Sequence, residues 1–316
     1  MNMTRFAAMA LLTIAIVVCG TGQSSAQSCG VTISNMNFGP NIDTLSSSPV
    51  DTTAELQFSC SGWPASERIL ICVHLGEGSV ASGGGARRME GGGNHLLYQL
   101  YQNPERSIVW GSANMAASIA ATAEGTGAVS GTRMIYGRVP GGQSTAAATT
   151  YSSTFSGADV EILYRAEPVG NDCATGSGSS GGAANFDVEA TVAQNCIVST
   201  APVNFGSHGA LNANIDATGT VYVTCTLATN YAIRLDGGGA AAAPTARRMA
   251  KGSDSITYGL YRNIARDQPW GDAEETRAHG TGSGSVQSHT VYGRVAPQTT
   301  PPTGVYTDTV VVIVDY

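Results

Sequence analysis

Cysteine and histidine are the residues of this chain whose types could carry metal or redox chemistry. After the first 26 residues the cysteines are Cys29, Cys60, Cys72, Cys173, Cys196 and Cys225. They show no CxxC spacing, and the histidines (His74, His95, His208, His279 and His289) show no HxxxH spacing. Both spacings are typical of zinc sites, so we expect no metal site. An even number of cysteines in an exported chain indicates disulfide bonds.

The sequence also lacks the motifs of nucleophilic and phosphate chemistry. It contains no nucleophile elbow, the strand-to-helix turn that presents a catalytic serine. The glycine-rich stretches at 91–95, 236–243 and 280–285 lack the strand-then-helix context of a phosphate-binding loop, so we interpret them as turns. We therefore expect a non-enzymatic protein without a cofactor. A hydrolase with a triad assembled from distant residues is the enzymatic alternative.

The N-terminus has the pattern of a secretory signal peptide over residues 1–26. Arg5 provides the positive charge, an apolar stretch follows, and Ser24, Ser25 and Ala26 form a small-residue cleavage site. No other stretch approaches the roughly 20 apolar residues that span a bilayer. The sequence therefore predicts an exported protein rather than a membrane-embedded one.

The mature chain is acidic. Without Arg5, 15 of the 16 Lys and Arg residues remain against 23 Asp and Glu, which gives a net charge of −8, and Lys251 is the one lysine. Phosphate binding needs concentrated positive charge, so we expect no nucleic-acid partner.

One sequence pattern occurs twice, at an offset of 160 residues. The segments ARRM (86–89), YQLYQN (98–103) and WG (110–111) return as ARRM (246–249), YGLYRN (258–263) and WG (270–271), and NFG and YGRV also recur in order. This order indicates a tandem domain duplication. The predicted organisation is a first domain at 27–173, a Gly/Ser linker at 174–185 and a second domain at 186–316.

Short β-branched runs separated by Gly-, Ser- and Asn-rich turns fill both copies. Examples are VYVTC (221–225) and YAIRL (231–235). This pattern predicts an all-β fold, a sandwich in each domain. The aromatic and basic residues that recur in both copies are interpreted as core and fold-level hydrogen-bonding residues: Tyr98, Trp110, Tyr258, Trp270, Arg87, Arg88, Arg247 and Arg248.

The duplication also predicts the disulfide pairing. Cys29 and Cys60 are separated by 31 residues and Cys196 and Cys225 by 29, so each copy is expected to contain one equivalent bond. Cys72 and Cys173 occur only in the first copy and are expected to pair by elimination. Each of the two equivalent bonds is worth about 3–4 kcal/mol in the loop-entropy model.

The duplicated pattern resembles the spore coat protein U family, whose members include subunits and tip adhesins of archaic (Csu-type) chaperone–usher pili. The resemblance implies two tandem immunoglobulin-like sandwiches, the C-terminal one lacking its final strand. It also implies donor-strand complementation, in which a periplasmic chaperone and then an adjacent pilin subunit supply that strand during assembly at an outer-membrane usher. The protein would then be secreted through the periplasm to the cell surface.

The expectation that the C-terminal domain lacks its final strand is supported by the segment GVYTDTVVVIVDY (304–316). Its apolar run is typical of a strand buried on both faces, and an incomplete sandwich exposes backbone and core side chains beside such a strand. We expect the groove to be lined by Val310, Val312, Val314 and Tyr316. For the first domain two closures stay open: the tail Ile162–Cys173 as its own last strand, or Phe186–Val192 folded back.

The two copies differ in the segment that a pilin donates. Phe186–Val192 precedes Cys196, whereas only Gln27 and Ser28 precede Cys29 in the predicted mature chain. A subunit that accepts a strand but has none to give ends a fibre. The sequence thus predicts a pilus tip adhesin, with a shaft pilin or secreted structural coat protein as the alternative.

Three loops of the first copy differ from their counterparts in the second, and in one of them apolar residues replace a charged loop. We expect them to form distal loops that attach to a hydrophobic surface or host ligand and support biofilm formation. These residues are Trp63, Met115, Ala116, Ala117, Ile119, Ala120 and Ala147. A lectin-like tip that binds a carbohydrate or receptor is the alternative, because a fold does not dictate its ligand.

Overall fold

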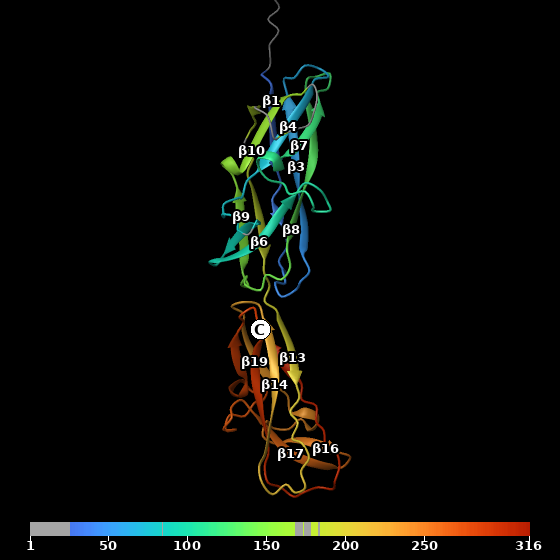
Figure 1. Cartoon of the computed structure of the whole chain (residues 1–316), viewed down its shortest axis with the longest axis vertical. Coiled ribbons are helices and arrows are strands. Elements are labelled where there is room, and N and C mark those ends of the chain that lie inside the picture. Colours follow the sequence, from blue (N-terminus) through green and yellow to red (C-terminus); the bar gives the residue numbers. More distant parts are fainter. Residues whose placement is uncertain (1–25, 84, 168–172, 174–177, 183) are drawn as a thin grey trace, which may run out of the picture.

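The computed structural model describes residues 26–83, 85–167, 173, 178–182 and 184–316. The predicted signal peptide, apart from Ala26, lies outside these residues. The chain forms two elongated all-β domains placed end to end, with the first domain at the top of Figure 1. Among the described residues, no helix is long and apolar enough to cross a membrane.

Domain one is a sandwich of two sheets. The larger has the order β1-β3-β8-β6-β5-β9-β12-β2, and the smaller has the order β11-β10-β4-β7. The strands are β1 (Ser28–Ile33), β2 (Met36–Asn37), β3 (Val50–Ser61), β4 (Arg68–Leu75), β5 (Arg87–Gly91), β6 (Asn94–Tyr101), β7 (Ala117–Thr122), β8 (Val129–Val139), β9 (Thr150–Phe155), β10 (Val160–Ala166), β11 (Ser179–Ser180) and β12 (Phe186–Thr191). Their inward-facing side chains form one continuous core.

Domain two repeats this architecture with fewer strands. Its sheets have the orders β13-β14-β19-β17-β16 and β18-β15-β20. The strands are β13 (Cys196–Ala201), β14 (Ile215–Cys225), β15 (Asn230–Leu235), β16 (Arg247–Lys251), β17 (Asp254–Tyr261), β18 (Ala278–Thr281), β19 (Gln287–Val295) and β20 (Val312–Asp315). Four short 3-10 turns complete the two domains: η1 (Ala113–Met115), η2 (Gly157–Asp159), η3 (Gly238–Ala240) and η4 (Glu274–Thr276).

A buried arginine and tryptophan hold the two sheets together in each domain. The Arg87 guanidinium donates to the carbonyls of Leu75 at 2.8 Å and Trp110 at 2.7 Å, and the Trp110 indole donates to Val73 at 2.9 Å. Arg247 and Trp270 repeat these contacts in domain two. The interpretation as fold-level hydrogen-bonding residues is confirmed for Arg87 and Arg247, whose guanidinium groups donate to buried carbonyls, whereas Arg248 is exposed to solvent.

All three predicted disulfides are present. Cys29–Cys60 and Cys196–Cys225 join directly opposed residues of the first strand pair in each domain, with Cα atoms 4.1 Å apart. Cys72–Cys173 joins β4 to the tail that follows β10. These bonds fix the start of each domain and the tail of the first.

Domain one is completed by a segment that sequence analysis assigned to domain two. β12 lies between β9, to which it runs antiparallel, and β2, to which it runs parallel. The alternating side chains Phe186, Val188 and Ala190 are buried, and the Phe186 ring stacks on Phe155 with centroids 4.5 Å apart.

This placement corrects the predicted end of the first domain at residue 173, the predicted linker at 174–185 and the predicted start of the second domain at residue 186. Residues 179–180 pair with β10, Gly182 bridges Gly30, and β12 ends at Thr191, so the first domain continues past its predicted end. The first strand of domain two is β13, which begins at Cys196. The physical reason is that the apolar face of β12 completes a groove that domain one would otherwise leave open.

Both closures that the sequence left open contribute to domain one. The tail supplies β10, which pairs with β4 in the smaller sheet as β20 pairs with β15 in domain two. The folded-back segment fills the separate groove between β9 and β2.

We expect Val188→Asp to destabilise domain one by about 3–5 kcal/mol, because it places an unpaired charge at the centre of the core. Urea unfolding followed by circular dichroism measures the change. Glu189→Gln, on the exposed face of the same strand, is the matched control and should alter the free energy of unfolding by less than about 0.5 kcal/mol. Equal stability of the two variants would show that β12 is not part of the domain one core.

Candidate strand-acceptor groove

Domain two contains an open groove of about 920 Å³ at the place where its sandwich is incomplete. One wall is the segment 200–209, and the other is the segment 300–310. The floor is formed by core side chains that include Val221, Tyr258, Leu260 and Val291. The groove is therefore a slot between two backbone segments with an apolar floor.

This groove corresponds to the slot that β12 fills in domain one. The repeated NFG segment places Asn204 at the position of Asn37 in β2, and the repeated tyrosine places Tyr306 at the position of Tyr151 in β9. In domain one both walls pair with β12. In the described part of domain two the only pairing of residues 300–311 is an isolated bridge between Thr307 and Ala250. The equivalent of β9 therefore lacks the neighbour that would complete it as a strand.

Only two of the four residues predicted to form the groove line it. Val310 and Val312 face the cavity. Val314 instead pairs with Ile233 within β20 and packs on the core, and Tyr316 is 55% exposed. Sequence analysis assigned the groove to alternate residues of one strand, whereas the slot lies beside the segment that precedes that strand.

The opposite wall was missed by sequence analysis. It contains Val203, Phe205 and Leu211, which follow β13. The repeated NFG segment was the available signal, because Phe38 of the first copy lies next to β12.

One carboxylate, that of Asp308, stands in the wall of this groove above its apolar floor. Asp308 accepts hydrogen bonds from the Tyr258 hydroxyl at 2.7 Å and from the Gly239 and Thr309 amides at 2.8 Å each. Burial, together with the hydrogen bond to Asp308, raises the pKa of Tyr258 well above its ordinary value. The equivalent Tyr98 faces Ser153 in domain one, and burial raises the pKa of Tyr98 to about 12.

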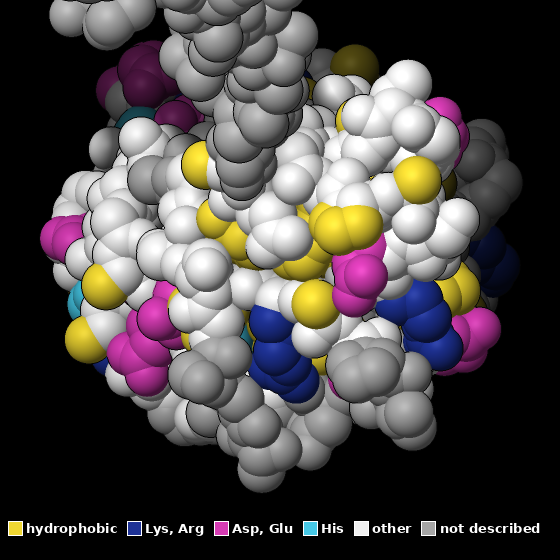
Figure 2. Space-filling model, turned by 90° about the horizontal axis from the view of Figure 1, so that it is seen from above, with side chains coloured by type: hydrophobic (Ala, Val, Ile, Leu, Met, Phe, Trp, Pro, Cys, Tyr) yellow, Lys and Arg dark blue, Asp and Glu magenta, His cyan; other side chains and the backbone are white. Residues whose placement is uncertain are grey.

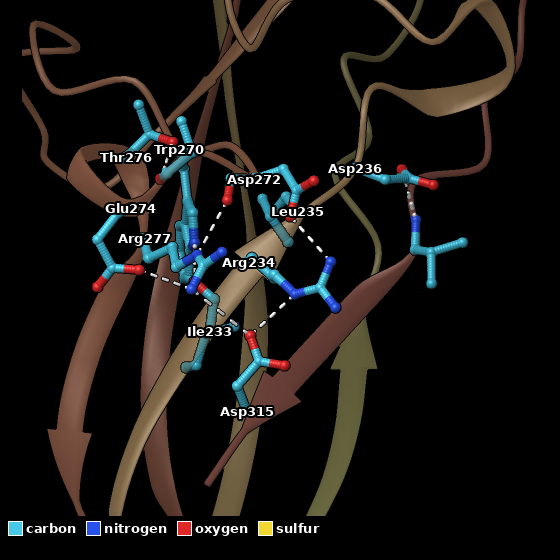
Figure 3. Close-up of polar contacts among 12 residues, drawn as sticks. Ile233, Arg234, Leu235, Asp236, Trp270, Asp272, Glu274, Thr276, Arg277 and Asp315 are labelled. Carbon is cyan, nitrogen blue, oxygen red and sulfur yellow. Dashed lines mark hydrogen bonds and ion pairs between the residues drawn. The ribbon is translucent and has the colours of Figure 1, made fainter.

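Ion pairs fix β20, the strand that follows the groove. Figure 3 shows Arg234 between Asp272 and Asp315, with nitrogen to oxygen distances of 2.9 Å to each. Arg277 pairs with Glu274 at 2.7 Å on the same surface. None of these groups lines the groove, so they position β20 without placing a charge in the cavity.

The structure contradicts most of the predicted surface-binding loop. Trp63, Ala117 and Ile119 belong to the core of domain one, and Ala116 and Ala147 are also buried. Met115, 47% exposed, and Ala120 are on the surface.

The reason is that Ala117–Thr122 forms β7, which pairs with β4 and alternates between the core and solvent. Trp63 packs edge-on against Tyr164, with ring centroids 6.0 Å apart. Ala147 faces domain two, where it forms a bridge with Leu227. The difference in charge between the copies therefore reflects core packing and a domain contact, rather than a distal loop.

Figure 2 shows the end of domain one that points away from domain two. Hydrophobic side chains form a small cluster near the middle of this face, and acidic and basic side chains border it. In the described residues, no group of three or more His, Cys, Asp or Glu side chains lies together as metal ligands would.

The fold and the groove define a two-domain β-sandwich protein with one filled and one open strand site. The chain belongs to the Spore Coat Protein U domain family, whose model matches residues 15–157 and 183–313. Protein U of Myxococcus xanthus is 33% identical over 155 residues, which cover 47% of this chain and 79% of that protein.

A solved structure shares the fold. A chain of the CsuC-CsuE chaperone-tip adhesion subunit pre-assembly complex, from archaic chaperone-usher Csu pili of Acinetobacter baumannii, is 16% identical with a TM-score of 0.53. The match covers 92% of this chain and 100% of that chain. The CupB6 tip adhesin from Pseudomonas aeruginosa is 9% identical with a TM-score of 0.41, over 91% of this chain and 94% of that one.

We expect the open groove to bind a fluorescent dye such as ANS, whose aromatic rings bind exposed apolar surface. Val310→Asp places a charge in the cavity and should reduce the dye signal at least twofold. Ile264→Asp is the control, because Ile264 is 74% exposed and does not line the groove, so its replacement should leave the signal unchanged. Equal signals from the two variants would contradict an accessible apolar groove.

Proposed function

We propose that this protein is a non-enzymatic subunit of a chaperone–usher pilus that accepts a donor strand in the groove of domain two. The observation that supports this proposal is the comparison within the chain: the same slot is filled by β12 in domain one and is open in domain two. An open slot exposes unpaired backbone groups and apolar side chains, and an added strand satisfies both.

The position of β12 supports placing the subunit at the tip of the fibre. β12 is the segment that precedes the first cysteine of domain two, where pilins of this family carry their donor strand. It is already seated within its own chain, between β9 and β2. A subunit whose donor strand is used internally while its acceptor site is open terminates a head-to-tail fibre.

The remaining partners follow from this role. A periplasmic chaperone would occupy the groove before assembly, an outer-membrane usher would assemble the fibre, and an adjacent pilin would then supply its strand. Domain one would face outward at the cell surface and mediate attachment and biofilm formation. Of the residues predicted to contact a surface, Met115 and Ala120 keep that assignment, because their side chains are exposed.

Immunogold electron microscopy of fibres from a strain that expresses the epitope-tagged protein tests this proposal. We expect gold at one end of each fibre. Val310→Asp should abolish the label, because a charge in the groove prevents strand insertion, and Ile264→Asp, an exposed position outside the groove, should retain it. Label along the shaft would overturn the tip assignment, and retention of label by Val310→Asp would overturn the acceptor role.

A further inference from the structure

We propose that Asp308 makes the groove of domain two selective for a donor strand with a hydrogen-bonding side chain at the position that faces this carboxylate. The same feature would exclude a copy of β12, the chain's own donor strand. This inference rests on the proposed function, because it specifies the strand that the acceptor groove takes.

Domain one supplies the template for the register. In the pairing of β12 with β9, Val188 lies directly opposite Ser153. The Val188 side chain is 0% exposed and Ser153 is 1% exposed, so both point into the sandwich. Directly opposed residues of antiparallel strands have Cβ atoms about 4.5–5.5 Å apart, so the side chain of the donor residue reaches the group opposite it.

The two grooves differ at this central position. Aligning Tyr306 with Tyr151 places Asp308 at the position of Ser153 and Val310 at that of Phe155. A strand inserted in the register of β12 would therefore place its Val188 equivalent against a carboxylate. It would place its Phe186 equivalent against the smaller side chain of Val310, which leaves room for a large apolar residue.

Three hydrogen bonds leave part of the Asp308 carboxylate unsatisfied. Two amides and one hydroxyl donate to it, and a carboxylate has about four acceptor sites. Asp308 is half-buried in the open groove, so water reaches the remaining site. An inserted strand removes this water.

A valine on the inserted strand would then leave the last acceptor site without a partner. Leaving a buried charged group unsatisfied is costly, and a hydroxyl donor at this position removes the cost. Arg247, buried beneath Tyr258, attracts Asp308 electrostatically, but its own N–H groups donate to the carbonyls of Asp236, Pro244, Leu235 and Trp270. It therefore does not replace the missing hydrogen bond.

Threonine and valine have the same shape and differ by the hydroxyl, which makes them a matched pair for the test. One peptide copies Asn185–Ala193, and the other carries Val188→Thr in the same sequence. Each is titrated by fluorescence anisotropy against the full mature chain. We expect the threonine peptide to bind about 10-fold more tightly, since a site built to hydrogen-bond a hydroxyl rejects the analogue that lacks it.

The Asp308→Ser chain is the matched protein variant, because it gives domain two the residue of domain one. It should bind the valine peptide at least as tightly as the threonine peptide. Equal binding of the two peptides to the unaltered chain would overturn this inference and leave the acceptor role intact. Failure of both peptides to bind either protein would overturn the acceptor role and this inference with it.

A double-mutant cycle within domain one tests the same pairing without added peptide. Ser153→Asp should lower the melting temperature of domain one, because its seated strand presents Val188 to the new carboxylate. Adding Val188→Thr should restore most of the loss, and its gain in melting temperature should be larger in the Ser153→Asp chain than in the unaltered chain, where it faces the neutral hydroxyl of Ser153. No rescue by Val188→Thr would contradict the proposed pairing.

Discussion

The structure depends on one slot of each sandwich, the place where an inserted strand pairs with a wall on each side and covers the core. A sandwich with one strand missing exposes backbone amides and carbonyls along a slot and leaves core side chains in water, and both are costly. Domain one meets this constraint with a segment of its own chain, and domain two leaves it open. The buried β12 and the cavity of about 920 Å³ are two states of the same slot, seen in one molecule.

The order of elements explains how one segment serves this purpose. β10 and the bond between Cys72 and Cys173 hold the tail of domain one against the smaller sheet, and β11 continues along that sheet. The chain then crosses to the larger sheet, fills the slot as β12, and leaves at the end of the domain where β13 begins. The strand that closes domain one is therefore also the direct connection to domain two.

Much of this fold was predictable from the sequence, because residues that recur in both copies have the same structural role in each domain. The recurrence of Arg87 and Trp110 as Arg247 and Trp270 identified a shared hydrogen-bonding network, and the equivalent cysteine spacings identified the disulfides. The position of β12 could not be derived in this way. Its alternation of apolar and polar residues predicts a strand with one buried face, but the pattern does not say which of two equivalent slots buries it.

The prediction of an apolar surface loop around Ile119 was wrong for a related reason. Comparing the copies showed that domain one is more apolar around Ile119. An apolar side chain in a strand faces either solvent or the core, and the pairing of β7 with β4 determines which of the two it faces. At Asp308, by contrast, a small difference between the copies has a large effect on the site. Asp308 aligns with a serine and is a small change in the sequence, yet it changes the chemistry of the slot.

Hydrogen–deuterium exchange of the mature chain, measured by mass spectrometry on peptides from both domains, tests the central claim most directly. Amides of Thr150–Phe155 should be protected by pairing with β12, and those of the equivalent residues 305–310 should exchange rapidly. Adding the peptide that carries Val188→Thr should protect residues 305–310 and leave domain one unchanged. Equal protection of the two segments in the free chain would contradict a filled slot in one domain and an open slot in the other.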